Sequence, residues 1–188
     1  MELKRTLIVA DASSLINFEA SQAMDEILET CGLEVGVVHP QVWTEVLYVR
    51  RPGIPDTAVV AIDLEAHERA GIVRRLRLDP AEMGVFVHLA GLMDDGEAAS
   101  LAVAITRRLD ILGDDRALAR LMKSEAPTVR LLSTPMLVRQ WVDVCKPEVA
   151  RASEIIENIE KYGRFVPAVT EPNYQWWAGL RRPTSREG

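Results

Sequence analysis

Few residues in this chain could build a disulfide or zinc framework. Its 188 residues include two cysteines, Cys31 and Cys145, which lie far apart in apolar sequence surroundings. They lack the close spacing of a zinc site, so we expect two reduced and partly buried thiols. The three histidines, His39, His67 and His88, are not clustered either, and we expect structural or surface positions for them.

Long apolar runs and an excess of basic residues are absent as well. No apolar stretch approaches the roughly 20 residues that cross a membrane, and the first residues lead directly into a short apolar run without signal-peptide character. We therefore expect a soluble, cytoplasmic protein. The net charge is −6, from 22 basic and 28 acidic residues. This balance gives no overall basic character of the kind that indicates nucleic-acid binding, although it leaves room for a local basic rim.

The residues that are present, 48% of them hydrophobic, suffice for one packed domain with an appendage. Short apolar runs alternate with helical patterns, which predicts an α/β fold: three α/β/α layers around a mostly parallel central sheet, plus a C-terminal helical extension. We expect residues 50–58, which hold two prolines and a glycine, to form a loop. The expected strands are 6–10, 33–38, 72–78, 110–113 and 129–132. The expected helices are 13–31, 41–49, 80–93, 96–109, 115–124, 135–144 and 147–162.

The last part of the chain lies beyond this alternating pattern. We expect residues 1–146 to form the main domain and residues 147–188 to add a helix and a tail that contains Trp176 and Trp177. Adjacent aromatic residues in a tail pack against their own protein or a partner more often than they stack on bases, and both interpretations stay open here.

Two of the apolar runs end in carboxylates. Residues 7–10 lead into Asp11, and residues 111–113 lead into Asp114 and Asp115. Parallel strands place their C-terminal ends at one edge of the sheet, where open α/β folds bind ligands. Like charges repel, so carboxylates gathered there indicate cation binding or acid–base chemistry.

Each acidic residue also has a plain structural interpretation. Asp11 can cap the following helix, as Ser13 can, and one of the two aspartates at 114 and 115 can cap the next. Glu97 falls in the first turn of its helix, where a negative charge is favourable in any case. Glu45 can be an ordinary surface residue of its expected helix.

The four segments together are less easily explained by structure alone. They would deliver Asp11, Glu45, Glu97 and Asp114 or Asp115 to the same edge of the sheet. Oxygen ligands of this kind suit Mg²⁺ or Mn²⁺ rather than zinc. Basic residues close to these segments would contact the phosphates of a substrate or pair with an aspartate. They are Arg50, Arg51 and Arg116.

The motifs that hold these acids resemble those of the PIN domain family, over roughly residues 6–135. The resemblance is strongest to a branch of predicted nucleic-acid-binding PIN proteins related to VapC-like toxin ribonucleases. The motifs are residues 8–16, 42–46, 95–102 and 112–117, which follow one another in the family's order.

The resemblance implies a PIN-like Mg²⁺- or Mn²⁺-dependent endoribonuclease that hydrolyses RNA phosphodiester bonds. Many relatives are toxins paired with an antitoxin, so an antitoxin is a candidate partner, and a homodimer is expected. Residues implied to be catalytic and to hold the metal are Asp11, Glu45, Glu97 and Asp114. Residues implied to be auxiliary are Ser13, Asp115 and Arg116, with Asp115 also an alternative metal ligand.

Two other functions fit parts of the sequence. The first is a non-catalytic module that binds nucleic acid or protein on the same scaffold. The second is a phosphatase-like α/β hydrolase. That chemistry typically uses an Asp-x-Asp sequence after the first strand, and this chain has Asp11-Ala12-Ser13 there, so we rank this function last.

Overall fold

The computed structural model describes residues 5–46, 48–55 and 58–181. Within them, five parallel strands form a central sheet in the order β5-β2-β1-β6-β7. Their bounds are β1 (Thr6–Ala10), β2 (Leu33–Val38), β5 (Val73–Leu76), β6 (Ile111–Leu112) and β7 (Leu131–Leu132). Two short strands, β3 (Tyr48–Val49) and β4 (Val60–Ala61), pair antiparallel beside it. The expected α/β class and parallel sheet are confirmed.

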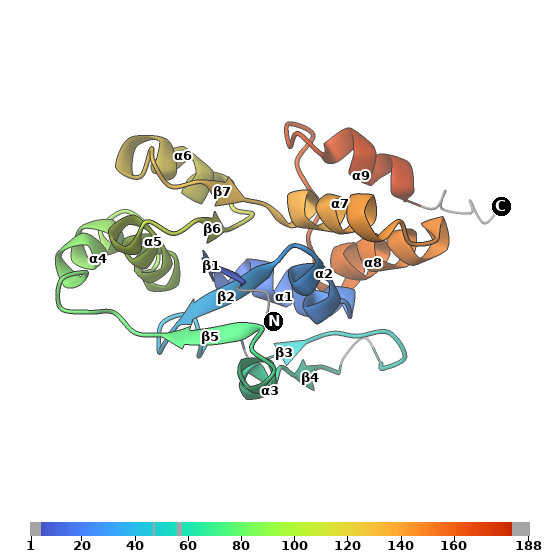
Figure 1. Cartoon of the computed structure of the whole chain (residues 1–188), viewed down its shortest axis with the longest axis horizontal. Helices are drawn as coiled ribbons and strands as arrows, with labels where there is room; N and C mark the ends of the chain where they lie inside the picture. Colours follow the sequence, from blue (N-terminus) through green and yellow to red (C-terminus); the bar gives the residue numbers. More distant parts are fainter. Residues whose placement is uncertain (1–4, 47, 56–57, 182–188) are drawn as a thin grey trace.

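Helices cover both faces of the sheet (Figure 1). One face carries α4 (Met83–Ala90) and α5 (Asp95–Arg107), and α5 contacts β1, β2 and β6. The other face carries α1 (Ala12–Ser21) and α2 (Met24–Thr30), which α7 (Thr134–Cys145) and α8 (Val149–Tyr162) pack against. The remaining helices are α3 (Leu64–Arg69), α6 (Arg116–Glu125) and α9 (Tyr174–Leu180). These are the three expected layers.

The middle strands are buried on both faces, as their unbroken apolar runs predict. Ile8, Val9 and Ala10 of β1 and Ile111 and Leu112 of β6 have no exposed surface. Burying a side chain of this size contributes about 1.5–3 kcal/mol, so these strands anchor the fold. Parallel pairing of β1 with β6 then brings the residues that follow the two strands side by side.

Three expected helices differ from the structure. Residues 41–45 form a turn rather than a helix, since Val42, Thr44 and Val46 are β-branched and disfavour helix formation. The helix expected over 13–31 is divided into α1 and α2 at Gln22, which has a left-handed φ of 57°. The helix expected at 80–93 is confined to α4, which spans Met83–Ala90. Helices α3 and α9 and the short strands β3 and β4 were not among the expected elements.

The C-terminal helices share the core of the rest of the protein. Ile155, Ile156 and Ile159 of α8 are fully buried, and α8 packs along α1. Trp177 of α9 is also fully buried, and its indole Nε1 donates a 2.8 Å hydrogen bond to Glu160. Residues 149–180 are therefore integrated into the face of the sheet that α1 covers.

No helix in the described part of the chain has the length and apolar character needed to span a membrane.

Candidate functional site

Asp11 lies where β1 ends and α1 begins, almost fully buried. It is the N-cap of α1, because its Oδ1 accepts a 2.8 Å hydrogen bond from the backbone N–H of Ser14. Its Oδ2 accepts a 3.0 Å hydrogen bond from the hydroxyl of Ser13. Burial, with a smaller contribution from the charge of Asp114, raises the pKa of Asp11 to about 6. The carboxylate is thus held in place by a serine, as the motif resemblance implies.

Asp114 follows β6 and is tied to two helices. Its Oδ1 accepts a 2.8 Å hydrogen bond from the backbone N–H of Thr134, at the start of α7. Its Oδ2 accepts from the Thr134 hydroxyl at 2.5 Å, from Asn17 Nδ2 at 3.0 Å and from the Ser14 hydroxyl at 3.2 Å. Burial raises the pKa of Asp114, and these four donors act against that rise. Asp114 therefore connects β6 to α1 and α7.

Asp115 has a more open carboxylate than its neighbour. It is the N-cap of α6, and its Oδ1 accepts hydrogen bonds from the backbone N–H groups of Ala117 and Leu118 at 2.5 and 3.1 Å. Its side chain is exposed, and its Oδ2 has no hydrogen bond within the described residues. Of the two aspartates, Asp115 has the oxygen that is free to contact a ligand.

Glu97 and Glu45 approach the same place from α5 and from the turn after β2. Burial and, in decreasing order, the charges of Asp94, Asp115, Asp11 and Glu45 together raise the pKa of Glu97 to about 7. These charges act on Glu97 together because the strand ends and the start of α5 meet at one edge of the sheet. Half-buried Glu97 thus lies close enough to Asp11, Glu45 and Asp115 for their charges to raise its pKa.

Glu45 is exposed on its turn and lies against the first turn of α5. Its Oε2 is 2.8 Å from where a Cβ at Gly96 would stand, so a larger residue at position 96 would displace the Glu45 carboxylate. Burial and the charges of Asp94 and Asp95 raise its pKa. Asp94, not Asp95, caps α5 by accepting a 2.9 Å hydrogen bond from the Glu97 N–H. All four predicted acids are therefore gathered at this edge.

The donor chemistry of the cluster suits a hard divalent cation. Every candidate ligand is a carboxylate oxygen, and the pKa values of Asp11, Glu45 and Glu97 are all raised partly by neighbouring negative charge. A bound cation would relieve that repulsion. In the part of the chain that is described, however, no three Asp, Glu, His or Cys side chains are already arranged as a metal-binding group. Cation binding would thus require side-chain adjustment.

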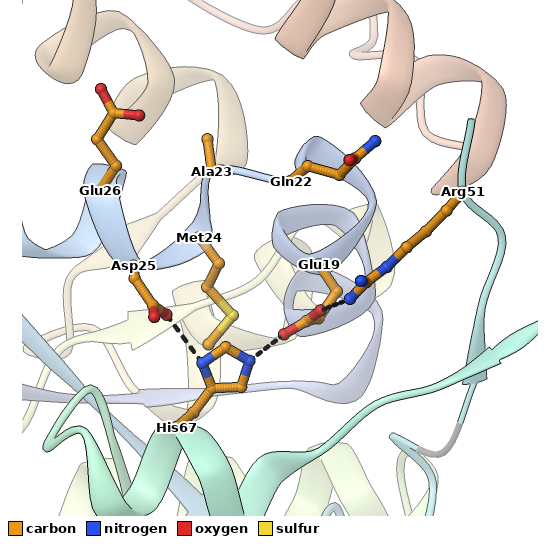
Figure 2. Close-up of a pocket in the computed structure, with 8 residues that line it drawn as sticks. All are labelled: Glu19, Gln22, Ala23, Met24, Asp25, Glu26, Arg51 and His67. Atoms are coloured by element: carbon orange, nitrogen blue, oxygen red, sulfur yellow. Dashed lines mark hydrogen bonds and ion pairs between the residues drawn. The ribbon is translucent and has the colours of Figure 1, made fainter. Parts of the chain in front are cut away.

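The predicted basic residues are distributed differently. Arg116 is exposed at the start of α6 and forms no ion pair within residues 5–46, 48–55 and 58–181, as expected for a residue free to contact phosphate. Arg51 lies elsewhere: it forms a 2.9 Å ion pair with Glu19, near the end of α1 opposite to Asp11 (Figure 2). Arg50 is half-buried beside it in the chain. Only Arg116 of the three lies among the acids.

A separate polar cluster surrounds Arg51. Figure 2 shows His67 of α3 between Glu19 of α1 and Asp25 of α2, with its Nδ1 2.8 Å from Asp25. The hydrogen bond to Glu19 is the main cause that raises the pKa of His67. This cluster ties α3 to α1 and α2. His39 contacts the Trp43 ring, and exposed His88 pairs with Glu125, so the histidines have the expected structural or surface positions.

The cysteines match their prediction only in part. Both are free thiols. Cys31 is half-buried, and burial raises its pKa to about 11. Cys145 was expected to be partly buried and is exposed instead, because it ends α7 on the outer side of the molecule.

No protein-family model matches the chain, and no curated protein matches its sequence. The site is therefore interpreted from its own geometry, and membership of the PIN family stays a prediction.

Several residues of the site were not anticipated. Asn17 and Thr134 hold Asp114, and Arg164 lines a cavity of about 270 Å³ together with Ser13 and Asp114. Thr134 had a signal in the sequence, because it follows the expected strand 129–132 and so belongs to the same edge of the sheet. Arg164 had none, since its position depends on how α8 packs on α1.

Proposed function

We propose that this protein is a Mg²⁺- or Mn²⁺-dependent endoribonuclease that hydrolyses RNA phosphodiester bonds. The observation that carries the proposal is the gathering of Asp11, Glu97, Glu45 and the pair Asp114–Asp115 at the C-terminal edge of a parallel sheet. The pKa values of Asp11, Glu97 and Glu45 are raised there by burial and, to a smaller extent, by neighbouring negative charges. A cluster of this kind costs stability unless a cation compensates it.

The acidic side chains have two different roles in this proposal. Asp11, Glu97 and the free oxygen of Asp115 would hold the cation, while Asp114 positions α1 and α7 around it. When bound, Mg²⁺ or Mn²⁺ would polarise the scissile phosphate and lower the pKa of the attacking water. Without the cation the pKa of Glu97 is about 7, and a bound cation would keep this carboxylate ionised at neutral pH. Exposed Arg116 would pair with a phosphate oxygen of the substrate.

The direct test is cleavage of a fluorescently labelled RNA of mixed sequence with Mn²⁺ or Mg²⁺, and with EDTA as a blank. We expect cleavage by the wild type and about a hundredfold less by Asp11→Asn and by Glu97→Gln. Equal cleavage by the wild type and both variants would show that the activity arises elsewhere.

A non-catalytic module on the same scaffold is the second candidate. It is favoured by the four hydrogen bonds that occupy Asp114 and by the lack of a ready-made metal group among the described residues. RNA binding without cleavage at millimolar Mn²⁺, and without a rise in melting temperature, would support this candidate against the nuclease.

The role as a toxin with an antitoxin, and the homodimer, belong to the same proposal. Exposed apolar side chains on and after α4, namely Met83, Val87 and Leu92, form the kind of surface that a second protein covers. Light scattering of the purified chain, alone and with the product of a neighbouring gene for a small DNA-binding protein, tests both partners.

A further inference from the structure

A cavity of about 220 Å³ adjoins the carboxylates on the side of α6. Asp114 and Asp115 line it, and its outer wall is formed by residues 165–168 of the segment that connects α8 to α9. Residues of the C-terminal part of the chain thus lie within reach of a ligand at the acidic site.

The outer wall is apolar and firmly supported. Phe165 packs edge-on against the ring of Trp177, with centroids 6.2 Å apart and an interplanar angle of 86°. Trp177 is fully buried and hydrogen-bonded to Glu160, so α8 and α9 fix the position of Phe165. Pro167 continues the wall with a rigid backbone.

The other sides of the cavity supply polar groups. Glu171 accepts hydrogen bonds at its Oε1 from the Ser133 hydroxyl at 3.1 Å and from Asn173 Nδ2 at 3.4 Å. Its Oε2 has no hydrogen bond in the described part of the chain. Arg116 lines the cavity from α6 and is unpaired within the same residues. The cavity therefore combines an apolar wall, a free carboxylate oxygen and a guanidinium.

These groups match a flat ring that has a polar edge and a phosphate attached. Proteins bind the bases of single-stranded RNA against apolar and aromatic side chains and hydrogen-bond their edges, while arginine contacts the phosphates. The free oxygen of Glu171 accepts hydrogen bonds only, so it favours a base with an exocyclic amino group. Uracil has no amino group at that edge: its one donor, N3–H, lies between two carbonyl oxygens, which a carboxylate repels.

We propose that this cavity binds one nucleobase of single-stranded RNA, next to the phosphate at the acidic site, and that it prefers adenine or cytosine to uracil. The proposal rests on the proposed function for the position of the RNA. It assigns the residues after 162 a role in substrate selection. Glu171 and Phe165 are the residues that determine the specificity.

The test measures binding separately from cleavage. Fluorescein-labelled hexamers of adenylate, cytidylate and uridylate are titrated with the full chain carrying Asp11→Asn and Glu97→Gln, in EDTA, and followed by fluorescence anisotropy. We expect the adenylate and cytidylate hexamers to bind at least about fivefold more tightly than the uridylate hexamer. Ala119→Leu, which fills the cavity from α6, should weaken their binding at least about fivefold.

Ala117→Leu is the matched control, because it lies exposed on the same helix and does not line the cavity. Equal binding by the Ala119→Leu and Ala117→Leu proteins, or equal binding of all three hexamers, would overturn the proposal. If Ala119→Leu does not fold, Glu171→Gln replaces it and should remove the preference over uridylate. An unchanged preference in Glu171→Gln would then overturn the proposal.

A cleavage assay of the wild type with Mn²⁺ separates this inference from the proposed function. If the hexamers bind with the expected preference and Ala119→Leu weakens their binding, but the wild type cleaves no RNA, the base site is supported and the nuclease proposal is overturned. If the wild type cleaves RNA but neither binding effect is seen, the nuclease proposal is supported and the base site is overturned.

Discussion

Asp11 combines a structural and a chemical role in one carboxylate. Its Oδ1 caps α1, and its position at the strand end brings its charge close to that of Asp114. Asparagine caps helices about as well as aspartate but has no charge. The two roles can therefore be separated by a single substitution.

We expect Asp11→Asn to keep or raise the melting temperature in EDTA, because the cap remains and the repulsion is relieved. The same variant should lose most of the rise in melting temperature that millimolar Mn²⁺ gives the wild type. Differential scanning fluorimetry measures both. Asp63→Asn is the matched control, since Asp63 caps α3 by the same kind of contact far from the acidic site. A wild type that does not respond to Mn²⁺ would contradict the metal site.

Asp114 and Asp115 should respond differently to substitution. Asp114→Ala leaves Asn17 and the Thr134 N–H without their acceptor, so we expect it to lower the free energy of unfolding by about 1–3 kcal/mol. Asp115→Asn keeps the cap of α6 and should be nearly neutral in EDTA, but it should reduce the Mn²⁺ response. Urea unfolding with and without Mn²⁺ tests both. If Asp114→Ala reduced the Mn²⁺ response without lowering stability, and Asp115→Asn left the Mn²⁺ response unchanged, Asp114 would be the main ligand.

The raised pKa values predict how pH affects the metal response. Asp11 and Glu97 titrate at about 6 and about 7, above their ordinary values of 3.8 and 4.5. An acid with a raised pKa contributes stability that is complete below its ordinary pKa and is lost as pH rises through the raised value. Between pH 5 and pH 7 the metal-free wild type should therefore lose stability that Asp11→Asn/Glu97→Gln retains, and above pH 7 the difference should level off.

The rise in melting temperature caused by Mn²⁺ should grow over the same interval, because protons compete with the cation below pH 6. Melting curves of the wild type and the double variant at pH 5, 6, 7 and 8, with Mn²⁺ or EDTA, measure both effects. A gap between the two proteins that is constant with pH would contradict the titration of these groups.

At the scale of elements, the close contact of α8 with α1 supports the acidic site. A Cβ at Gly163, which ends α8, would lie 2.7 Å from the side-chain Oδ1 of Asn17 and 3.2 Å from its Cα. Asn17 in turn donates to Asp114. The C-terminal extension thus presses on a residue that orients a candidate ligand.

Gly163→Ala should therefore lower the free energy of unfolding by about 1–3 kcal/mol, because the added methyl group meets a packed neighbour. It should also reduce cleavage by displacing Asn17. Gly179→Ala on α9 is the matched control, since a Cβ there meets nothing within 4 Å. Urea unfolding and the RNA assay measure the two effects, and equal stability of the two variants would contradict the close contact.

The turn that follows β2, at residues 41–45, replaces the helix expected at residues 41–49. Val42, Trp43 and Val46 are all buried, a spacing that is compatible with one face of a helix. Val42, Thr44 and Val46 are β-branched, however, and the segment forms a turn instead. Glu45 is exposed on this turn. Glu45 still lies at the acidic edge of the sheet, because the turn follows β2 directly.

For the whole molecule, the division expected at residue 146 has a clear physical consequence. Ile155, Ile156 and Ile159 are fully buried on α8, which packs along α1 with its fully buried Phe18. A chain ending at residue 146 would expose this apolar face, and each large side chain removed from a core costs about 2–5 kcal/mol.

We expect the 1–146 fragment to lack a cooperative thermal transition and to aggregate. The full-length Ile156→Ala protein should fold with reduced stability, which makes it a graded control. Circular dichroism melting and size-exclusion chromatography distinguish the outcomes. A fragment that melts cooperatively as a monomer would show that residues 1–146 form an independent domain.

The sequence by itself determined the alternation of buried strands and helices. Apolar runs such as 7–10 and 111–112 can be satisfied only where both faces are covered, and parallel pairing then sends Asp11 and Asp114 to one edge. This reasoning required only the periodicity of the side chains and the rule that the ends of parallel strands coincide.

Only the tertiary structure decided which groups the carboxylates meet. Asn17 lies far from Asp114 in sequence and donates to it, and Arg164 lines a cavity beside it; both positions depend on the packing of α8 on α1. Such contacts cannot be predicted from local sequence patterns, because the contacts arise when whole helices are buried against one another. For the same reason, the role of Asp115 and the cavity beside segment 165–171 emerged only from the fold.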